Sequence, residues 1–305
     1  MPAAETSFQA MGGRAHLVVN GGRHLLSYGR QLVEALEARW SRFRPDSDVA
    51  RLNRAAGAPV RVTPETLLIM RLVVDAWKLT AGRFDPTVVG ALEANGYHRS
   101  FAATARGPAG PGGPARPVPA SGLAGVVLDS SGPTVTLPPH VGIDLGGIGK
   151  GTAADLVVMR LLAAGARGVC LNLGGDLRAS GQAPQPDGWV VAIEDPFRPE
   201  QELARVVVAD GAVATSSRLV RTWDLGGSTY HHLIDPASGL PSDSGLAAVT
   251  VVAGCAWWAE VLATATFVAG PEEGARLIDV HGVTGVLVDD RGGVQTLPGF
   301  DGLRV

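Results

Sequence analysis

The sequence predicts an α+β fold with largely antiparallel sheets. Several predicted strands follow one another directly, and the predicted helices fall between groups of strands instead of after each strand. The chain has 305 residues, of which 46% are hydrophobic and 18% charged, so it can bury a large core. This length fits one large domain or two closely packed lobes, and we expect a single domain over residues 1–305 with helices flanking its sheets.

The N-terminal part is predicted to hold one strand and two helices. Residues 15–19 form a strand candidate, and a helix is expected from about Leu25 to Trp40. Thr63 is suited to cap a second helix, because Pro64 would occupy its first position, and Gly82 is expected to end it.

A segment rich in proline and glycine follows at residues 102–122, with the sequence AATARGPAGPGGPARPVPASG. It holds too little apolar surface to offset the entropy lost on ordering, so we expect a flexible loop. Beyond it, residues 126–128 and 134–137 are predicted to pair as a hairpin around a Ser-Ser-Gly turn.

The second half of the chain supplies most of the predicted strands. Apolar residues at helical spacing predict a packed helix over residues 152–164. Further strands are expected at residues 169–173, 189–193, 204–208, 246–252 and 285–288, and further helices at residues 256–268 and 272–280.

Charge and cysteine usage exclude several classes of protein. The net charge of −3, without a block of Lys or Arg, gives no footprint for nucleic acid or anionic lipid. Cys170 and Cys255 stand apart in apolar runs, which favours reduced thiols over a disulfide or zinc site. Neither a signal segment nor an apolar run of about 18 residues is visible, so we expect a cytoplasmic protein without a membrane span.

The first segment with a chemical signature reads Asp-Leu-Gly-Gly-Ile-Gly-Lys-Gly from Asp144 and leads into the predicted helix. Glycine N–H groups at a helix start, together with Lys150, would suit a phosphate. A Walker A loop is excluded because Gly151 follows the lysine and Asp144 replaces the first glycine; a GxGxxG fingerprint also fails. Phosphate binding and tight backbone packing both explain the glycines.

Two further segments combine turns with polar side chains. Residues 172–176, Asn-Leu-Gly-Gly-Asp, end a predicted strand and would allow close approach of a ligand or simply form an exit turn. Residues 215–217, Thr-Ser-Ser, precede a motif in which His232 and Asp235 flank a rigid turn before Gly239. Such a histidine serves either a site or the structure.

The last segment places Glu260 and Thr264 on one face of an apolar helix, four residues apart. A carboxylate in such surroundings is costly unless it is paired or bound to a metal. Carboxylate and hydroxyl oxygens suit Mg²⁺, whereas a salt-bridged Glu at the helix edge is the structural alternative.

In this order and spacing the segments resemble the ApbE-type family, the FAD:protein FMN transferases. The resemblance covers nearly the whole chain outside the Pro/Gly-rich loop. It rests on Met-Gly at 11–12, Ser-Arg-Phe to Leu-Asn at 41–53, Gly-Arg-Phe-Asp-Pro-Thr at 82–87, and the segments at 144–151, 172–176, 214–216, 232–239 and 260–264.

The resemblance implies a two-lobed, T-fold-like α+β unit with FAD in the cleft between the lobes. It further implies Mg²⁺-dependent transfer of FMN from FAD to a Ser or Thr hydroxyl of an acceptor protein, with release of AMP. Hydrolysis of FAD to FMN and AMP, or FAD binding without catalysis, are the alternatives within the same family.

The resemblance also implies roles for single residues. The metal would be held by Glu260, Thr264 and the backbone carbonyl of Gly149. Catalytic groups are expected at Lys150, His232 and Asp235. Residues expected to bind FAD are Met11, Asp85, Gly147, Gly149, Lys150, Asp155, Gly174, Gly175, Asp176, Thr215, Ser216 and His232.

Three positions depart from the family's pattern. Glu260 replaces an aspartate and is one methylene longer, which can shift a site that demands octahedral geometry. Thr152 replaces a tyrosine, which removes an aromatic ring that could pack against flavin. Ser217 replaces a glycine and is expected to crowd a close backbone approach.

Overall fold

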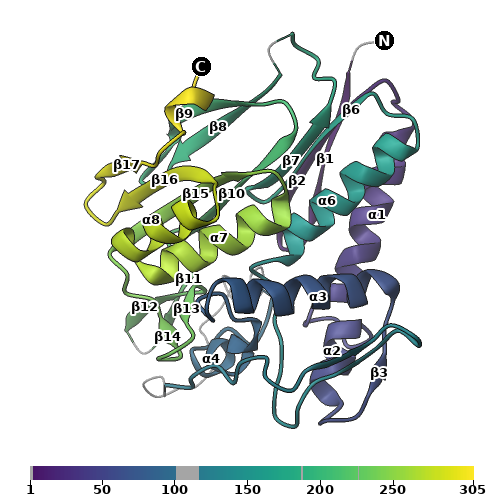
Figure 1. Ribbon diagram of the computed structural model, residues 1–305, viewed down its shortest axis with the longest axis vertical. Coiled ribbons are helices and arrows are strands. Elements are labelled where there is room, and N and C mark those ends of the chain that lie inside the picture. Colours follow the sequence, from purple (N-terminus) through teal and green to yellow (C-terminus); the bar gives the residue numbers. More distant parts are fainter. Residues whose placement is uncertain (1–2, 101–116, 187, 226) are drawn as a thin grey trace.

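The computed structural model describes residues 3–100, 117–186, 188–225 and 227–305. Its centre is an eight-stranded sheet in the order β1-β2-β6-β7-β10-β15-β16-β17 (Figure 1). Every pair of neighbouring strands is antiparallel, which confirms the predicted sheet type. The strands are β1 (Ala4–Ala10), β2 (Gly13–Asn20), β6 (Gly168–Leu173), β7 (Asp176–Gly181), β10 (Gly211–Ser217), β15 (Leu246–Ala253), β16 (Thr284–Asp289) and β17 (Val294–Thr296).

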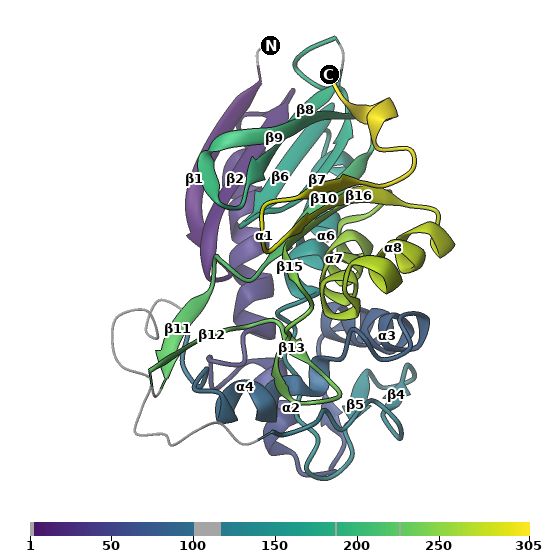
Figure 2. The ribbon, with the colours of Figure 1, turned by 90° about the vertical axis from the view of Figure 1, so that its left-hand side faces the viewer.

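Four helices cover one face of this sheet (Figures 1 and 2). On β2, Ala15, Leu17 and Val19 are fully buried and point toward them. A methyl group on Gly29 would press against Leu17, so the first helix needs glycine to reach the sheet. The helices are α1 (Leu25–Trp40), α6 (Gly149–Ala163), α7 (Ala256–Ala269) and α8 (Pro271–Val280).

A long hairpin covers part of the opposite face of the sheet. It consists of β8 (Trp189–Asp195) and β9 (Arg198–Val208), which pair only with each other among the named strands. The inward side chains Trp189, Val191 and Ile193 form a second core with sheet residues such as Val213 and Val286.

The second lobe lies below the sheet in Figure 1 and is joined to it by one continuous apolar core. Asn53 ties its small helices to the segment before α6, because its side-chain amide exchanges two hydrogen bonds with the backbone of Ile143, at 2.8 and 2.9 Å. The elements of this lobe are α2 (Asp48–Arg54), β3 (Val60–Arg61), α3 (Pro64–Leu79), η1 (Pro86–Val88), α4 (Val89–Ala94), β4 (Val127–Asp129), β5 (Thr134–Thr136), β11 (Thr222–Leu225), β12 (Ser228–His231), β13 (Ile234–Asp235) and β14 (Leu240–Pro241). The chain ends after η2 (Asp301–Leu303), beside β9.

Most predicted elements are present. Thr63 caps α3 and accepts a hydrogen bond from the Thr66 N–H, with Pro64 in the first position. The predicted hairpin forms as β4 and β5. Most of the predicted loop at 102–122 lies outside the described residues, and its last part is held to the second lobe, where the Ala120 N–H donates to the Pro236 carbonyl at 2.8 Å. In the described part of the chain, no helix has the length and apolar character that a membrane crossing requires.

Helix α6 begins at Gly149, three residues before the predicted start. Glycine disfavours a helix, but Gly151 is needed here because α7 crosses α6 at this point. A methyl group on Gly151 would overlap the backbone of Ala256 and Trp257. Tight backbone packing therefore explains this glycine, and it sets the distance between the two helices.

Replacing Gly151 with Ala should destabilise the protein by about 1–3 kcal/mol, because the added methyl group has no space between two backbones. Urea denaturation would measure this. Gly254→Ala is the matched control, since no atom lies within 4 Å of its added methyl group. Equal stability of the two variants would contradict the packing argument.

Candidate functional site

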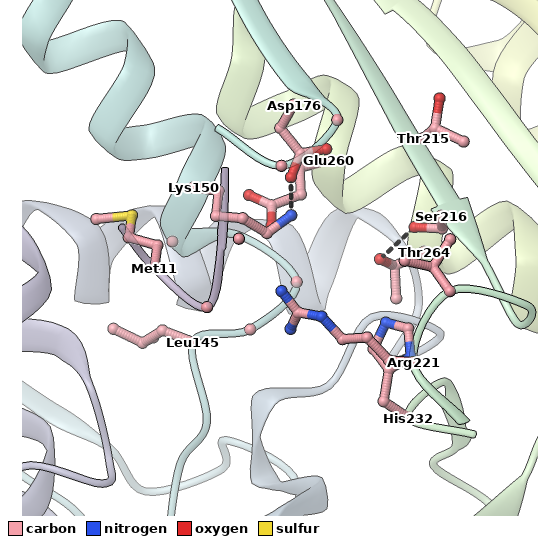
Figure 3. Close-up of a pocket in the computed structure, with 18 of the residues that line it drawn as sticks. Met11, Leu145, Lys150, Asp176, Thr215, Ser216, Arg221, His232, Glu260 and Thr264 are labelled. Carbon is pink, nitrogen blue, oxygen red and sulfur yellow. Dashed lines mark hydrogen bonds and ion pairs between the residues drawn. The ribbon is translucent and has the colours of Figure 1, made fainter. Parts of the chain in front are cut away.

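A cavity of about 1090 Å³ opens where the two lobes meet (Figure 3). Its walls come from the β1–β2 turn, the start of α6, the β6–β7 turn, β8, the end of β10 and the segment before β13. The predicted site residues that line it are Met11, Asp85, Gly147, Gly149, Lys150, Gly174, Gly175, Asp176, Thr215, Ser216, His232, Glu260 and Thr264.

Close backbone approaches shape one wall. Met11 and Gly12 both have positive φ, at 51° and 75°, and so turn β1 sharply into β2 beside the cavity. A methyl group on Gly13 would lie 3.4 Å from the α-carbon of Gly174, so the β1–β2 and β6–β7 turns nearly touch. The glycines of both turns therefore present backbone atoms to the cavity.

A buried cluster of charges lies at the start of α6. Lys150 forms an ion pair with Asp176, and its ammonium nitrogen is 3.4 Å from Oε1 of Glu260. Burial alone would lower the pKa of Lys150, but the two carboxylates reverse this and raise it. The lysine is therefore charged at neutral pH.

Glu260 is only 3% exposed, and its two carboxylate oxygens have different surroundings. Oε2 accepts a hydrogen bond from the Gly151 N–H at 2.7 Å, at the positive end of α6. Oε1 is buried and accepts no hydrogen bond within the described ranges. Burial raises the pKa of Glu260 to about 8, against the opposing effect of Lys150.

Thr264 lies one turn further along α7 and also faces the cavity. Its hydroxyl is 3.1 Å from the hydroxyl of Ser216, and a methyl group on Gly147 would lie 3.4 Å from it. Among the described residues no group of three His, Cys, Asp or Glu side chains could hold a metal ion. A metal here would need the hydroxyl of Thr264 and a backbone oxygen beside Glu260.

His232 and Arg221 form the opposite wall (Figure 3). Nδ1 of His232 is buried without a hydrogen-bond partner in the described chain. Burial, aided by the charges of Arg221 and Lys150, holds the pKa of His232 well below its usual range. The imidazole is therefore neutral at physiological pH.

A family model, described as the ApbE family, matches residues 11–287. The chain belongs to the ApbE family. This confirms the resemblance seen in the motifs.

Curated relatives in this family are named FAD:protein FMN transferase. The Rhodobacter capsulatus relative is 33% identical over 85% of this chain, and the Vibrio cholerae relative is 27% identical over 88%. The chain spans 49% of the first relative's length and 79% of the second's.

Solved structures show the same fold over nearly the full chain. The ApbE protein of Thermotoga maritima matches with a TM-score of 0.87 at 26% identity, covering 99% of both chains. The apo form of the Pseudomonas stutzeri flavinyl transferase ApbE matches with a TM-score of 0.81 at 27% identity, covering 99% of this chain and 96% of that one. The predicted ApbE-like α+β fold is thus confirmed.

Two predicted residues of this ApbE-family site do not line the cavity. The carboxylate of Asp155 accepts hydrogen bonds from the N–H groups of Ala256 and Trp257, at 3.0 and 2.9 Å, and so caps α7. Arg178 approaches the same carboxylate at 3.1 Å. Asp235 closes its own turn by accepting from backbone N–H groups two and three residues ahead.

The carboxylate of Asp85 borders the cavity but is already occupied. It accepts hydrogen bonds from the Trp77 indole at 3.1 Å and from the N–H and hydroxyl of Thr87 at 2.8 and 2.6 Å. Burial raises the pKa of Asp85. The Asp85 carboxylate thus holds the Gly-Arg-Phe-Asp-Pro-Thr motif in place at the cavity wall.

Thr152, one of the three departures from the family pattern, lies outside the cavity. Thr152 is 2% exposed, bonds its hydroxyl to the Ile148 carbonyl at 2.8 Å, and does not line the cavity. The threonine side chain therefore lies in the helix packing. Aromatic residues that line the cavity are Trp40, Phe43, Phe84 and Tyr97.

Sequence reasoning missed Arg221. Its guanidinium extends into the cavity, and a methyl group on Gly12 would lie 3.6 Å from it (Figure 3). It hydrogen-bonds Tyr97, and within the described chain it forms no salt bridge with a carboxylate. Arg221 is a single arginine in a segment without periodicity, so its residue type did not indicate a site. Its position between Ser217 and the His232 motif was the one feature that could have done so.

We expect Asp155→Ala to lower the free energy of unfolding by about 1–2 kcal/mol, because α7 loses its cap. FAD affinity, measured by fluorescence titration, should stay unchanged. Intact stability with weakened FAD binding would instead return Asp155 to the ligand site.

Proposed function

We propose that the chain transfers FMN from FAD to a Ser or Thr hydroxyl of an acceptor protein and releases AMP, with Mg²⁺ as the required ion. One observation carries this proposal. Two cations, Lys150 and Arg221, and two oxygen donors, Glu260 and Thr264, converge on one glycine-walled cavity. The relatives named FAD:protein FMN transferase support the same activity.

The cavity suits a dinucleotide in size and in chemistry. At about 1090 Å³ it slightly exceeds the usual volume of small-molecule sites, about 300 to 1,000 Å³, as a large ligand requires. The start of α6 offers the positive end of its helix dipole, to which Lys150 and Arg221 add full charges. A diphosphate would be bound at this point.

The donor set fits a hard divalent cation. Oε1 of Glu260 is buried and unpaired by hydrogen bonds, and Thr264 adds a hydroxyl oxygen on the same cavity. Together with the backbone carbonyl of Gly149, these residues would hold Mg²⁺, which would act as a Lewis acid toward the diphosphate. If Glu260 bound the metal in place of the Lys150 ammonium, Lys150 would still be paired with Asp176.

In the proposed transfer the acceptor hydroxyl attacks the phosphorus of the FMN half, and the bond between this phosphorus and the AMP oxygen breaks. His232, which is neutral because of its burial, accepts the hydroxyl proton. Lys150 and Arg221 stabilise the charge that accumulates on the departing phosphate.

The test is incubation with FAD, Mg²⁺ and a peptide library that contains one fixed central Thr, followed by mass spectrometry. Peptides that gain FMN, with AMP released, support the transferase. Free FMN and AMP without labelled peptide would identify a hydrolase, and unchanged FAD would identify a binding protein. The best-labelled sequence is then synthesised as the acceptor peptide.

Glu260→Gln should abolish Mg²⁺-dependent turnover, because an amide keeps the size of the side chain but not its charge. The measurement is the rate of AMP release against Mg²⁺ concentration. Glu272→Gln, an exposed acid in α8, is the control and should behave as the wild type. An unchanged Mg²⁺ dependence in Glu260→Gln would refute the metal assignment.

Arg221→Met should lower kcat by about a hundredfold or more, as the loss of one preorganised donor does in other transfer reactions. Arg218→Met is the matched control, because Arg218 lies in the same segment but pairs with Asp290 at 2.7 Å, outside the cavity lining. If both variants lose the same activity, the effect belongs to the segment and not to the guanidinium group.

A further inference from the structure

One edge of β8 has no strand partner in the part of the chain that the structure describes. β8 pairs with β9 from Trp189 opposite Val208 onward, and these two strands form a sheet of their own. The outer edge of β9 is partly covered by the end of the chain, since Val206 bridges to Arg304 and the Val305 N–H donates to the Arg205 carbonyl at 3.1 Å. The outer edge of β8 has no such cover.

The cavity follows this free edge. Val191, Ala192, Ile193 and Glu194 all line it, whereas β9 contributes no lining residue. Side chains of successive strand residues point to opposite faces, and β8 alternates between buried and exposed in this way. Four consecutive lining residues therefore mean that the cavity runs along the backbone edge and not under one face.

The floor beside this edge is a part of the main sheet. Ala15 and Leu17 of β2 point toward the helices, so Arg14 and His16 point to the face that carries the hairpin. Both line the cavity, as does Asn172 of β6. The same cavity continues past Met11–Gly13 and Gly174–Gly175 to Lys150, so edge and charge cluster share one space.

We propose that the acceptor protein binds along this edge as an extended segment that pairs with β8 and delivers its Ser or Thr hydroxyl to the charge cluster. The inference rests on the proposed transfer and names the surface that receives the second substrate. A strand edge offers alternating N–H and C=O groups, which match a peptide backbone. Four residues of β8 span about 13 Å, at about 3.3 Å per residue.

The alternative occupant of this edge is a part of FAD itself. The phosphates of FAD would be attracted to the two cations Lys150 and Arg221, neither of which belongs to the β8–β9 hairpin. Near β8 the charges are mixed, because Arg14 stands among the lining residues with Glu194, and His16 is 3.2 Å from Glu5. Such a surface favours hydrogen bonding to a neutral backbone over binding an anion.

Ala192→Trp tests the edge directly, because a small exposed side chain beside the cavity is replaced by a ring that obstructs it. We expect the KM for the acceptor peptide to rise tenfold or more, while the KM for FAD stays unchanged. Val190→Trp is the matched control. It lies on the same exposed face of β8, is 45% exposed, and does not line the cavity, so both KM values should match the wild type.

A scan of the peptide by backbone N-methylation tests the same pairing with the wild-type enzyme, and it does not depend on a variant folding. Methylation at alternate positions should raise the peptide's KM about tenfold, and methylation at the intervening positions should leave it unchanged, because only every second N–H of an added strand faces β8. An effect without this period of two would overturn strand addition.

The remaining outcomes separate the two proposals. An equal rise in both KM values for Ala192→Trp would assign the edge to FAD, and an unchanged peptide KM would show that the edge is not used. Either result overturns the inference while the transfer itself stands. A wild-type protein that labels no peptide overturns both.

Discussion

The site depends on one buried interaction, the carboxylate of Glu260 at the start of α6. Ionising a carboxyl group that is 3% exposed is costly unless its partners replace the lost water, and burial raises the pKa of Glu260 accordingly. The partners of Glu260 are the Gly151 N–H and the Lys150 ammonium, both from α6. The same ammonium also pairs with Asp176, which belongs to β7. Three elements that are distant in sequence are thereby fixed to one point, and the cavity forms around it.

This arrangement is reciprocal. α7 sends Glu260 to the N-terminus of α6, and α6 sends Asp155 to the N-terminus of α7. Each carboxylate satisfies backbone N–H groups that a helix start leaves unpaired. The two contacts act together with the close crossing at Gly151, so packing and charge specify the same angle between the helices. The acid that faces the cavity is available for a ligand, and the acid on the far side serves the structure.

The sequence predicts those parts of the structure whose pattern lies within a short stretch of the chain. Helices α1 and α3 follow from periodicity and from Thr63 with Pro64, and Glu260 with Thr264 follows from the spacing of one helix. Strands β1, β7 and β10 were not predicted, although β1 and β7 pair with their sequence neighbours β2 and β6 across tight turns. Their segments hold many polar or small side chains, so the alternation of apolar residues is weak. Asp155 and Arg221 show the same limit: one looks like a ligand residue and caps a helix, and the other has no pattern and reaches the cavity.

The three residues that depart from the family pattern differ in whether they line the cavity. Thr152 is buried within α6 and does not line the cavity. Ser217 does line the cavity, and its hydroxyl accepts from the Leu219 N–H at 3.2 Å, which fixes the start of the segment that carries Arg221. Glu260 uses its extra methylene within a crossing that only glycine permits. The longer acid reaches across this close helix contact to the Gly151 N–H with Oε2, and its Oε1 lies at the cavity wall, 3.4 Å from the Lys150 ammonium.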